Sequence, residues 1–185
     1  MVIPAVSFAS ATGTENRKFS FNGHVWGDTK ASVIAIEGPP DDDEVGADKN
    51  LYSITYHGEL HSKDTLLVYQ FTPDGLDRIL QLLLVSHDDV ALYINDYYDV
   101  RSWLVEMYGD PVTITSDDPI MVAGEDLMWD SDAHKIAYEN DKATALLYGY
   151  LNYYCWFRLQ DAVITLRMSS ESFNINIAID YDRII

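Results

Sequence analysis

The sequence predicts an α+β fold, an antiparallel sheet of two three-stranded meanders with helices packed on one face, arranged as a tandem pseudo-repeat. Three observations indicate this fold. Strand-like runs follow one another over short connections. Two helical segments each end in glycine and then proline, and the residues of these two helix ends align at one constant offset. A chain of 185 residues suits one structural domain. Its expected parts are a tail at 1–18, repeat 1 at 19–86, and repeat 2 at 87–185 with an insertion at 116–150.

The first half begins with a short helix that Asp28 can cap and Gly38 ends. We expect an acidic loop at 41–50 after it. Three strands follow, at 51–57, 65–72 and 76–85, and the last of them places Leu80, Leu82 and Leu84 on one face. The turn before this strand is Pro73-Asp74-Gly75, in which proline presets φ and glycine takes a positive φ.

The second half follows the same plan with an insertion. A helix is expected at 90–108, capped by Asp88 or Asp89 and ended by Gly109. A second helix is expected at 132–148. The remaining strands are expected at 152–159, 162–168 and 173–181, and in the last of these isoleucines alternate with smaller or polar residues.

The two helix ends can be aligned at one offset. Val33 then pairs with Leu104, Gly38 with Gly109, and Pro40 with Pro111. One helix on a three-stranded meander buries a single sheet face, and two such units side by side make a fuller core. The pattern therefore predicts an internal duplication.

A helix closed by Gly-x-Pro and followed by antiparallel strands resembles the beta-lactamase-inhibitor-protein-like superfamily. The segments Trp26-Gly27 and Glu37-Gly38-Pro39-Pro40, with Val33 between them, are also similar to uncharacterised exported domains of Gram-positive bacteria. The resemblance implies a sheet with helices on one face and a protein-binding role. It carries over no active-site residues.

Charge and composition limit the classes of partner that the chain is expected to bind. The chain has 30 acidic and 12 basic residues, a formal net charge of −18, which repels nucleic acid and anionic membranes. We therefore expect a protein or peptide partner and no nucleic acid. No apolar run approaches the roughly 20 residues of a membrane-spanning helix, so no transmembrane segment is expected. The single cysteine, Cys155, lies in an apolar run and is expected to be a buried thiol.

The N-terminus indicates export. Residues 1–11 are apolar and then small, and they end in Ala9-Ser10-Ala11, the A-x-A pattern of a signal-peptidase site. We expect residues 1–18 to be a remnant signal peptide or a disordered tail. The predicted location is extracellular or in the cell envelope, with the cytoplasm as the alternative.

The residues that could carry chemistry are few. The histidines of His57-Gly58-Glu59-Leu60-His61 would converge on a metal if they lay on a helix, but Gly58 and the flanking strands favour a hairpin loop. The run Asp130-x-Asp132-x-His134 mimics the start of a calcium loop without its glycine. The acidic run 41–44 could bind calcium loosely. No phosphate-binding loop or nucleophile elbow occurs, so we expect no catalytic residue, metal or cofactor, and no enzyme.

The last sheet offers a binding surface instead. If Tyr153, Cys155 and Phe157 face the helices, the side chains between them face the other way. The open face is then expected to carry Tyr154, Trp156, Arg158, Thr165 and Arg167. Aromatic side chains beside arginines are enriched in protein interfaces.

The predicted function is therefore a non-catalytic, exported or cell-surface module that binds protein or peptide. The alternative is a cytosolic immunity-type protein whose acidic surface neutralises a basic toxin.

Overall fold

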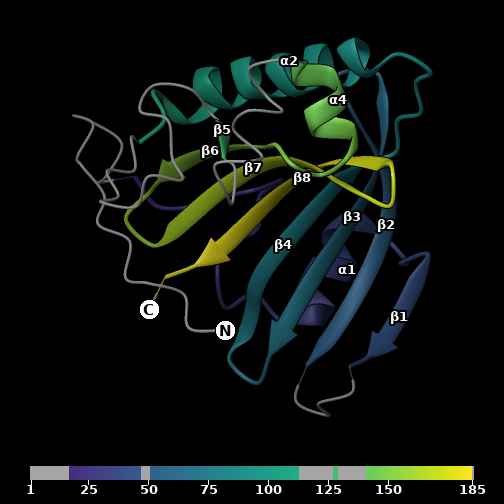
Figure 1. Cartoon of the computed structure of the whole chain (residues 1–185). Coiled ribbons are helices and arrows are strands. Elements are labelled where there is room, and N and C mark those ends of the chain that lie inside the picture. Colours follow the sequence, from purple (N-terminus) through teal and green to yellow (C-terminus); the bar gives the residue numbers. More distant parts are fainter. Residues whose placement is uncertain (1–16, 47–50, 113–126, 129–140, 185) are drawn as a thin grey trace. The chain divides into compact units, whose positions relative to one another are not determined.

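The computed structural model describes residues 17–46, 51–112, 127–128 and 141–184, and it confirms the α+β class (Figure 1). An open antiparallel sheet has the strand order β1-β2-β3-β4-β8-β7-β6-β5. Its strands are β1 (Asp42–Val45), β2 (Tyr52–Leu60), β3 (Lys63–Thr72), β4 (Gly75–Leu83), β5 (Leu127–Met128), β6 (Asn152–Arg158), β7 (Ala162–Glu171) and β8 (Asn174–Arg183). The helices are α1 (Lys30–Glu37), α2 (Val90–Tyr108) and α4 (Lys142–Leu147).

Two compact units divide the chain. Among the described residues, one unit comprises 87–112, 127–128, 141–158 and 165–177, and we call it the α2 unit. The other comprises 17–46, 51–86, 159–164 and 178–184, and we call it the α1 unit. Each unit has its own apolar core, and each is described by itself below.

In the α1 unit, the short helix packs its one fully buried residue, Val33, toward the core. Thr29 caps this helix, since its side chain accepts a hydrogen bond from the Ser32 N–H at 3.1 Å. The expectation that Asp28 is the cap is therefore wrong. Asp28 instead accepts from the Val25 N–H at 3.1 Å and stabilises the preceding turn. At the other end, Gly38 ends the helix with a φ of 91°.

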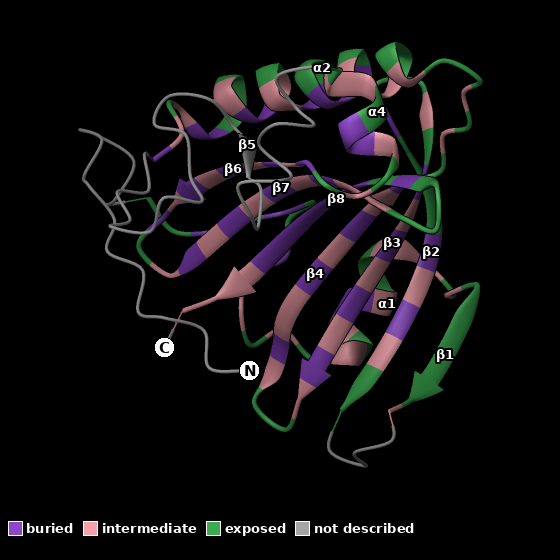
Figure 2. Cartoon of the chain, viewed as in Figure 1, coloured by how far each residue is buried: buried purple, intermediate pink, exposed green. Residues whose placement is uncertain are grey.

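The buried side of strand β4 is not the side that carries Leu80 and Leu82. Leu80 and Leu82 do share a face, but that face is half-exposed, and Leu84 lies beyond the strand and is exposed. The buried positions are Leu76, Ile79, Gln81 and Leu83. A register shift between Gln70 and Phe71 of β3 leaves Asp77 and Arg78 both outside the buried set. Figure 2 shows the alternation of buried and half-buried residues along β3 and β4.

The acidic segment after α1 is a strand and not only a loop. Residues Asp42–Val45 form β1, which pairs antiparallel with β2 from Asp42 opposite Thr55 to Val45 opposite Tyr52. Every residue of β1 is exposed. A strand with no buried side leaves no alternating pattern in the sequence, and for this reason the sequence predicts only a loop there.

In the α2 unit, the long helix has the predicted bounds, Val90–Tyr108. Asp89 caps it by accepting from the Ala91 N–H at 2.9 Å, and Gly109 ends it with a φ of 82°. Its buried side packs on β6, where the Tyr97 ring lies 5.2 Å from the Tyr153 ring. Of the helix expected at 132–148, the described residues contain α4, which spans Lys142–Leu147. Residues 132–140 lie outside the described residues.

Candidate functional site

The five predicted binding residues lie on β6 and β7, on the side away from α2. Tyr153 and Phe157 of β6 contact the rings of Tyr97 and Tyr108 on α2, at centroid distances of 5.2 and 6.3 Å. Because side chains alternate along a strand, the residues between them point to the opposite face. Those residues are half-buried, as are the corresponding residues of β7. They are Tyr154, Trp156, Arg158, Thr165 and Arg167.

The structure brings two of these residues into direct contact. The rings of Tyr154 and Trp156 stack at a centroid distance of 5.4 Å with an interplanar angle of 7°. The main chain behind them is held in place, because the Trp156 carbonyl accepts a hydrogen bond from the Val112 N–H at 2.8 Å. We call this surface, made by the five residues above, the β6–β7 face. Its stacked rings form a rigid apolar contact area with arginines on the same two strands.

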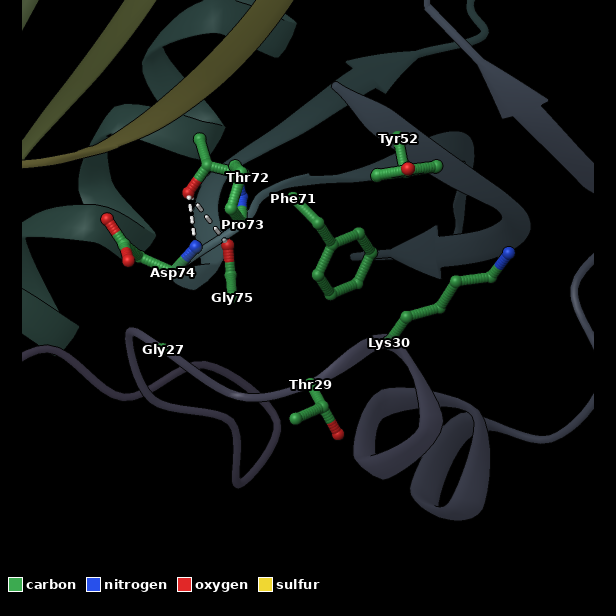
Figure 3. A pocket seen from close by; sticks show the side chains of 9 residues that line it. All are labelled: Gly27, Thr29, Lys30, Tyr52, Phe71, Thr72, Pro73, Asp74 and Gly75. Carbon is green, nitrogen blue, oxygen red and sulfur yellow. Dashed lines mark hydrogen bonds between the residues drawn. The ribbon is translucent and has the colours of Figure 1, made fainter. Parts of the chain in front are cut away.

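A pocket in the α1 unit lies where the start of α1 meets the ends of β2 and β3 (Figure 3). Its cavity volume is about 460 Å³, within the range of small-ligand sites. In this view the Phe71 ring lies in the middle of the lining residues, with the exposed Tyr52 side chain above it and Thr29 and Lys30 below it. The remaining lining comes from Gly27, Thr29, Lys30, Thr72, Pro73, Asp74 and Gly75.

The pocket is shaped by a close approach of two glycines. Gly75, with a φ of 97°, lies against the main chain of Gly27, and a Cβ added at Gly75 would overlap the Gly27 carbonyl. The Gly27 N–H donates to the Leu76 carbonyl at 2.9 Å, and the Leu76 N–H donates to the Asp28 carbonyl at 2.8 Å. The turn prediction at Gly75 is confirmed. The pocket itself was missed, because its walls lie far apart in the sequence and only their turn motifs signal them.

The Lys30 ammonium at the pocket rim is already paired. The Lys30 ammonium donates to both carboxylate oxygens of Asp43, at 2.6 and 2.5 Å. The other walls are apolar rings, glycine main chain, threonine hydroxyls and Asp74. This combination suits a ligand that is mostly apolar and carries a few polar groups.

A third feature of the α1 unit is a polar cluster around Glu37, at the last residue of α1. Glu37 Oε1 accepts from the Tyr69 hydroxyl at 2.6 Å and lies 3.1 Å from Nε2 of the fully buried His24. Burial, together with the hydrogen bond to the Glu37 carboxylate, raises the pKa of the Tyr69 hydroxyl above its usual value. The cluster joins residues up to 32 positions apart, so no local sequence pattern indicates it.

No protein-family model matches the sequence, and no curated protein and no solved structure matches it either. The residues of the chain itself therefore carry any functional assignment.

The metal-like motifs of the sequence take other positions. His57 and Glu59 are exposed residues of β2, and the expectation of a hairpin loop there is wrong, because the turn is His61-Ser62. The Asp41 carboxylate accepts from the His57 N–H at 2.7 Å, and this hydrogen bond lowers the pKa of Asp41. Within the described ranges, no group of three or more metal-ligating side chains gathers. The run 130–134 lies outside them. Cys155 is buried, as predicted.

Proposed function

We propose that this chain is a non-catalytic binding module that recognises a protein or peptide through the β6–β7 face. The observation that carries the proposal is the stacked pair of Tyr154 and Trp156 on the side of β6 that does not pack on α2. The buried side of the same strand supplies the core of the α2 unit. One strand therefore holds its outward rings on a rigid support.

Stacked rings favour binding for a physical reason. A tyrosine and a tryptophan offer large contact areas with few rotatable bonds, so little conformational entropy is lost when a partner covers them. Arg158 and Arg167 place guanidinium groups on the same two strands, and Thr165 adds a hydroxyl. Tryptophan, tyrosine and arginine are the residue types that most often dominate interface energetics.

We also propose that the chain is a tandem repeat of a helix and a three-stranded meander, as in the superfamily it resembles. The two helix ends support this. Gly38 has a φ of 91° and its N–H donates to the Ile34 carbonyl at 2.9 Å, while Gly109 has a φ of 82° and donates to the Val105 carbonyl at 2.8 Å. The aligned residues Val33 and Leu104 are both fully buried. The same offset pairs Asp28 with Asp99, and these two residues differ in structure, since Asp28 precedes α1 and Asp99 lies within α2.

Export to the cell surface or envelope belongs to the same proposal, and it rests on the Ala9-Ser10-Ala11 pattern. Residues 1–16 lie outside the described part of the chain. Among the residues that the structure describes, no helix is long and apolar enough to cross a membrane.

An immunity-type protein that neutralises a basic toxin is the second candidate, favoured by the net charge of −18 and by the fully exposed acidic strand β1. The two candidates differ in salt dependence. Binding that depends on long-range charge attraction weakens steeply when the salt concentration rises from about 50 to about 500 mM, because dissolved salt screens the charges. Binding through stacked rings changes much less.

Chemical-shift mapping tests the proposal. Peptides selected on the wild-type protein from a displayed random library serve as the probe, and ¹H–¹⁵N spectra are recorded as each peptide is added. We expect the largest shifts in β6 and β7, including the indole N–H of Trp156, which Trp156→Phe assigns. Shifts confined to other parts of the chain would contradict the proposed face.

A further inference from the structure

The hairpin between β7 and β8 has an unfavourable turn. Its two residues, Ser172 and Phe173, have φ values of 52° and 66°. Two-residue turns with positive φ at both positions normally carry Asn-Gly, because a side chain with a Cβ is strained in the left-handed region. A bulky aromatic residue there is an outlier. Folding alone would favour glycine or asparagine at position 173.

The strained residue presents an exposed ring to a cluster of other rings. Phe173 is 61% exposed, Tyr148 is 53% exposed and Tyr150 is 37% exposed. The Phe173 and Tyr148 rings meet edge to face at 5.2 Å, and Tyr148 stacks on Tyr150 at 5.8 Å with an interplanar angle of 25°. We call these three residues the aromatic platform. Figure 2 colours the β7–β8 turn as exposed.

Contacts within the α2 unit hold together the two turns that carry the aromatic platform. The Ser170 hydroxyl donates to the Leu147 carbonyl at the end of α4, at 2.8 Å. Gly149, with a φ of 73°, lies so close that an added Cβ would be 2.8 Å from the Ser170 carbonyl oxygen. These contacts join the turn after α4 to the β7–β8 hairpin, as Figure 1 shows. The main chain that carries the three rings is therefore held by contacts between the two turns.

The residue types at positive φ differ between this turn and two other tight turns of the chain. The turns Asn22-Gly23 and His61-Ser62 also have positive φ at both residues, and all four of these residues are polar or glycine. Only at Ser172-Phe173, among the turns in the described ranges, does a positive φ present a large apolar ring. Strain that persists at an exposed residue indicates a role outside folding.

We propose that the aromatic platform binds an arginine-bearing cationic segment of a partner protein. The faces of aromatic rings attract cations, and guanidinium groups stack on them in preference to ammonium groups. Glu171 is exposed and immediately precedes the turn, so it adds a negative charge to this end of the hairpin, and the net charge of −18 draws cationic segments toward the chain. This second contact surface does not depend on the β6–β7 face.

Two glycine variants separate the ring from the strain. Phe173→Gly removes both, whereas Ser172→Gly removes strain at the neighbouring position and keeps the ring. Both variants are expected to melt a few degrees above the wild type, on the order expected when a left-handed residue becomes glycine. Phe173→Asn, which also tolerates this conformation, is a second ring-deleting variant.

Binding of hexa-arginine and hexa-lysine peptides, measured by calorimetry at 150 mM salt, then tests the platform. We expect hexa-arginine to bind more tightly than hexa-lysine, and Phe173→Gly and Phe173→Asn to weaken hexa-arginine binding by about fivefold. Ser172→Gly and Leu92→Ala, the latter on the exposed side of α2, are expected to leave its Kd within twofold of the wild type. A hexa-arginine Kd that both Phe173 variants leave unchanged would overturn the proposal while leaving the β6–β7 face untouched.

Discussion

The Tyr69 hydroxyl donates a 2.6 Å hydrogen bond to Glu37 Oε1, which ties strand β3 to the last residue of α1. The same oxygen lies 3.3 Å from the Asn22 amide nitrogen, which donates to it. The carboxylate therefore ends the helix in a polar cluster under the sheet. The stability of the α1 unit is therefore expected to depend on whether the Tyr69 hydroxyl is protonated.

Stability at alkaline pH is expected to depend on Tyr69. Its pKa is raised in the folded protein by burial and by Glu37, so its neutral form stabilises the fold fully below about pH 10, the usual tyrosine pKa. This stabilisation is lost as the pH rises further, because the unfolded chain ionises more readily. Tyr69→Phe should cost about 1 kcal/mol at pH 7 and flatten the alkaline decline.

Urea unfolding at pH 7, 9, 10 and 11 measures this effect. Burial also raises the pKa of Tyr56, whose hydroxyl donates to the Gly38 carbonyl at 2.9 Å, so some alkaline decline remains in the variant. An identical pH profile for the wild type and Tyr69→Phe would show that the Tyr69–Glu37 bond has no such effect.

The cap of α2 can be tested with two neighbouring carboxylates. Asp89 accepts from the Ala91 N–H, whereas Asp88 is exposed and precedes the cap. Asp89→Ala should lower the free energy of unfolding by about 1 kcal/mol, and Asp88→Ala should leave it within about 0.5 kcal/mol. Both variants remove the same charge, so the difference isolates the capping bond. Equal losses in denaturant titrations would contradict it.

The approach of Gly75 to Gly27 should make Gly75 intolerant of any side chain. Gly75 and Gly23 both have positive φ, but only at Gly75 would an added Cβ overlap another main chain. Gly23→Ala should cost about 1 kcal/mol through strain alone, and Gly75→Ala should cost at least about 2 kcal/mol. Thermal melting of the two variants measures the difference, and similar melting temperatures would mean that the turn can move away from Gly27.

The sequence predicts the parts of this fold that local chemistry determines. The Asp and Gly residues around 90–108 bound α2 correctly, and alternating isoleucines locate β8. The β6–β7 face follows from the same alternation, since Tyr153, Cys155 and Phe157 are buried as expected. That this face binds a partner stays a prediction.

Features set by long-range contacts could not be read from the sequence. The buried side of β4 depends on a register shift in β3, and the acidic strand β1 forms only because β2 lies beside it. The Asp96 side chain, almost fully buried in α2, is paired with His87 Nε2 at 2.7 Å. A buried carboxylate of this kind interrupts the apolar stripe from which the sequence predicts the helix face.

Two measurements on Trp156→Ala decide whether the β6–β7 face binds a partner. The first is its Kd for peptides selected on the wild type, and the second is its melting temperature, with Leu92→Ala on the exposed side of α2 as the matched control. We predict that Trp156→Ala weakens binding at least about tenfold, as for an interface hot spot, and shifts the melting temperature by less than about 4 °C. Unchanged binding, with a melting temperature lowered by about 10 °C or more, would instead show that Trp156 serves the core.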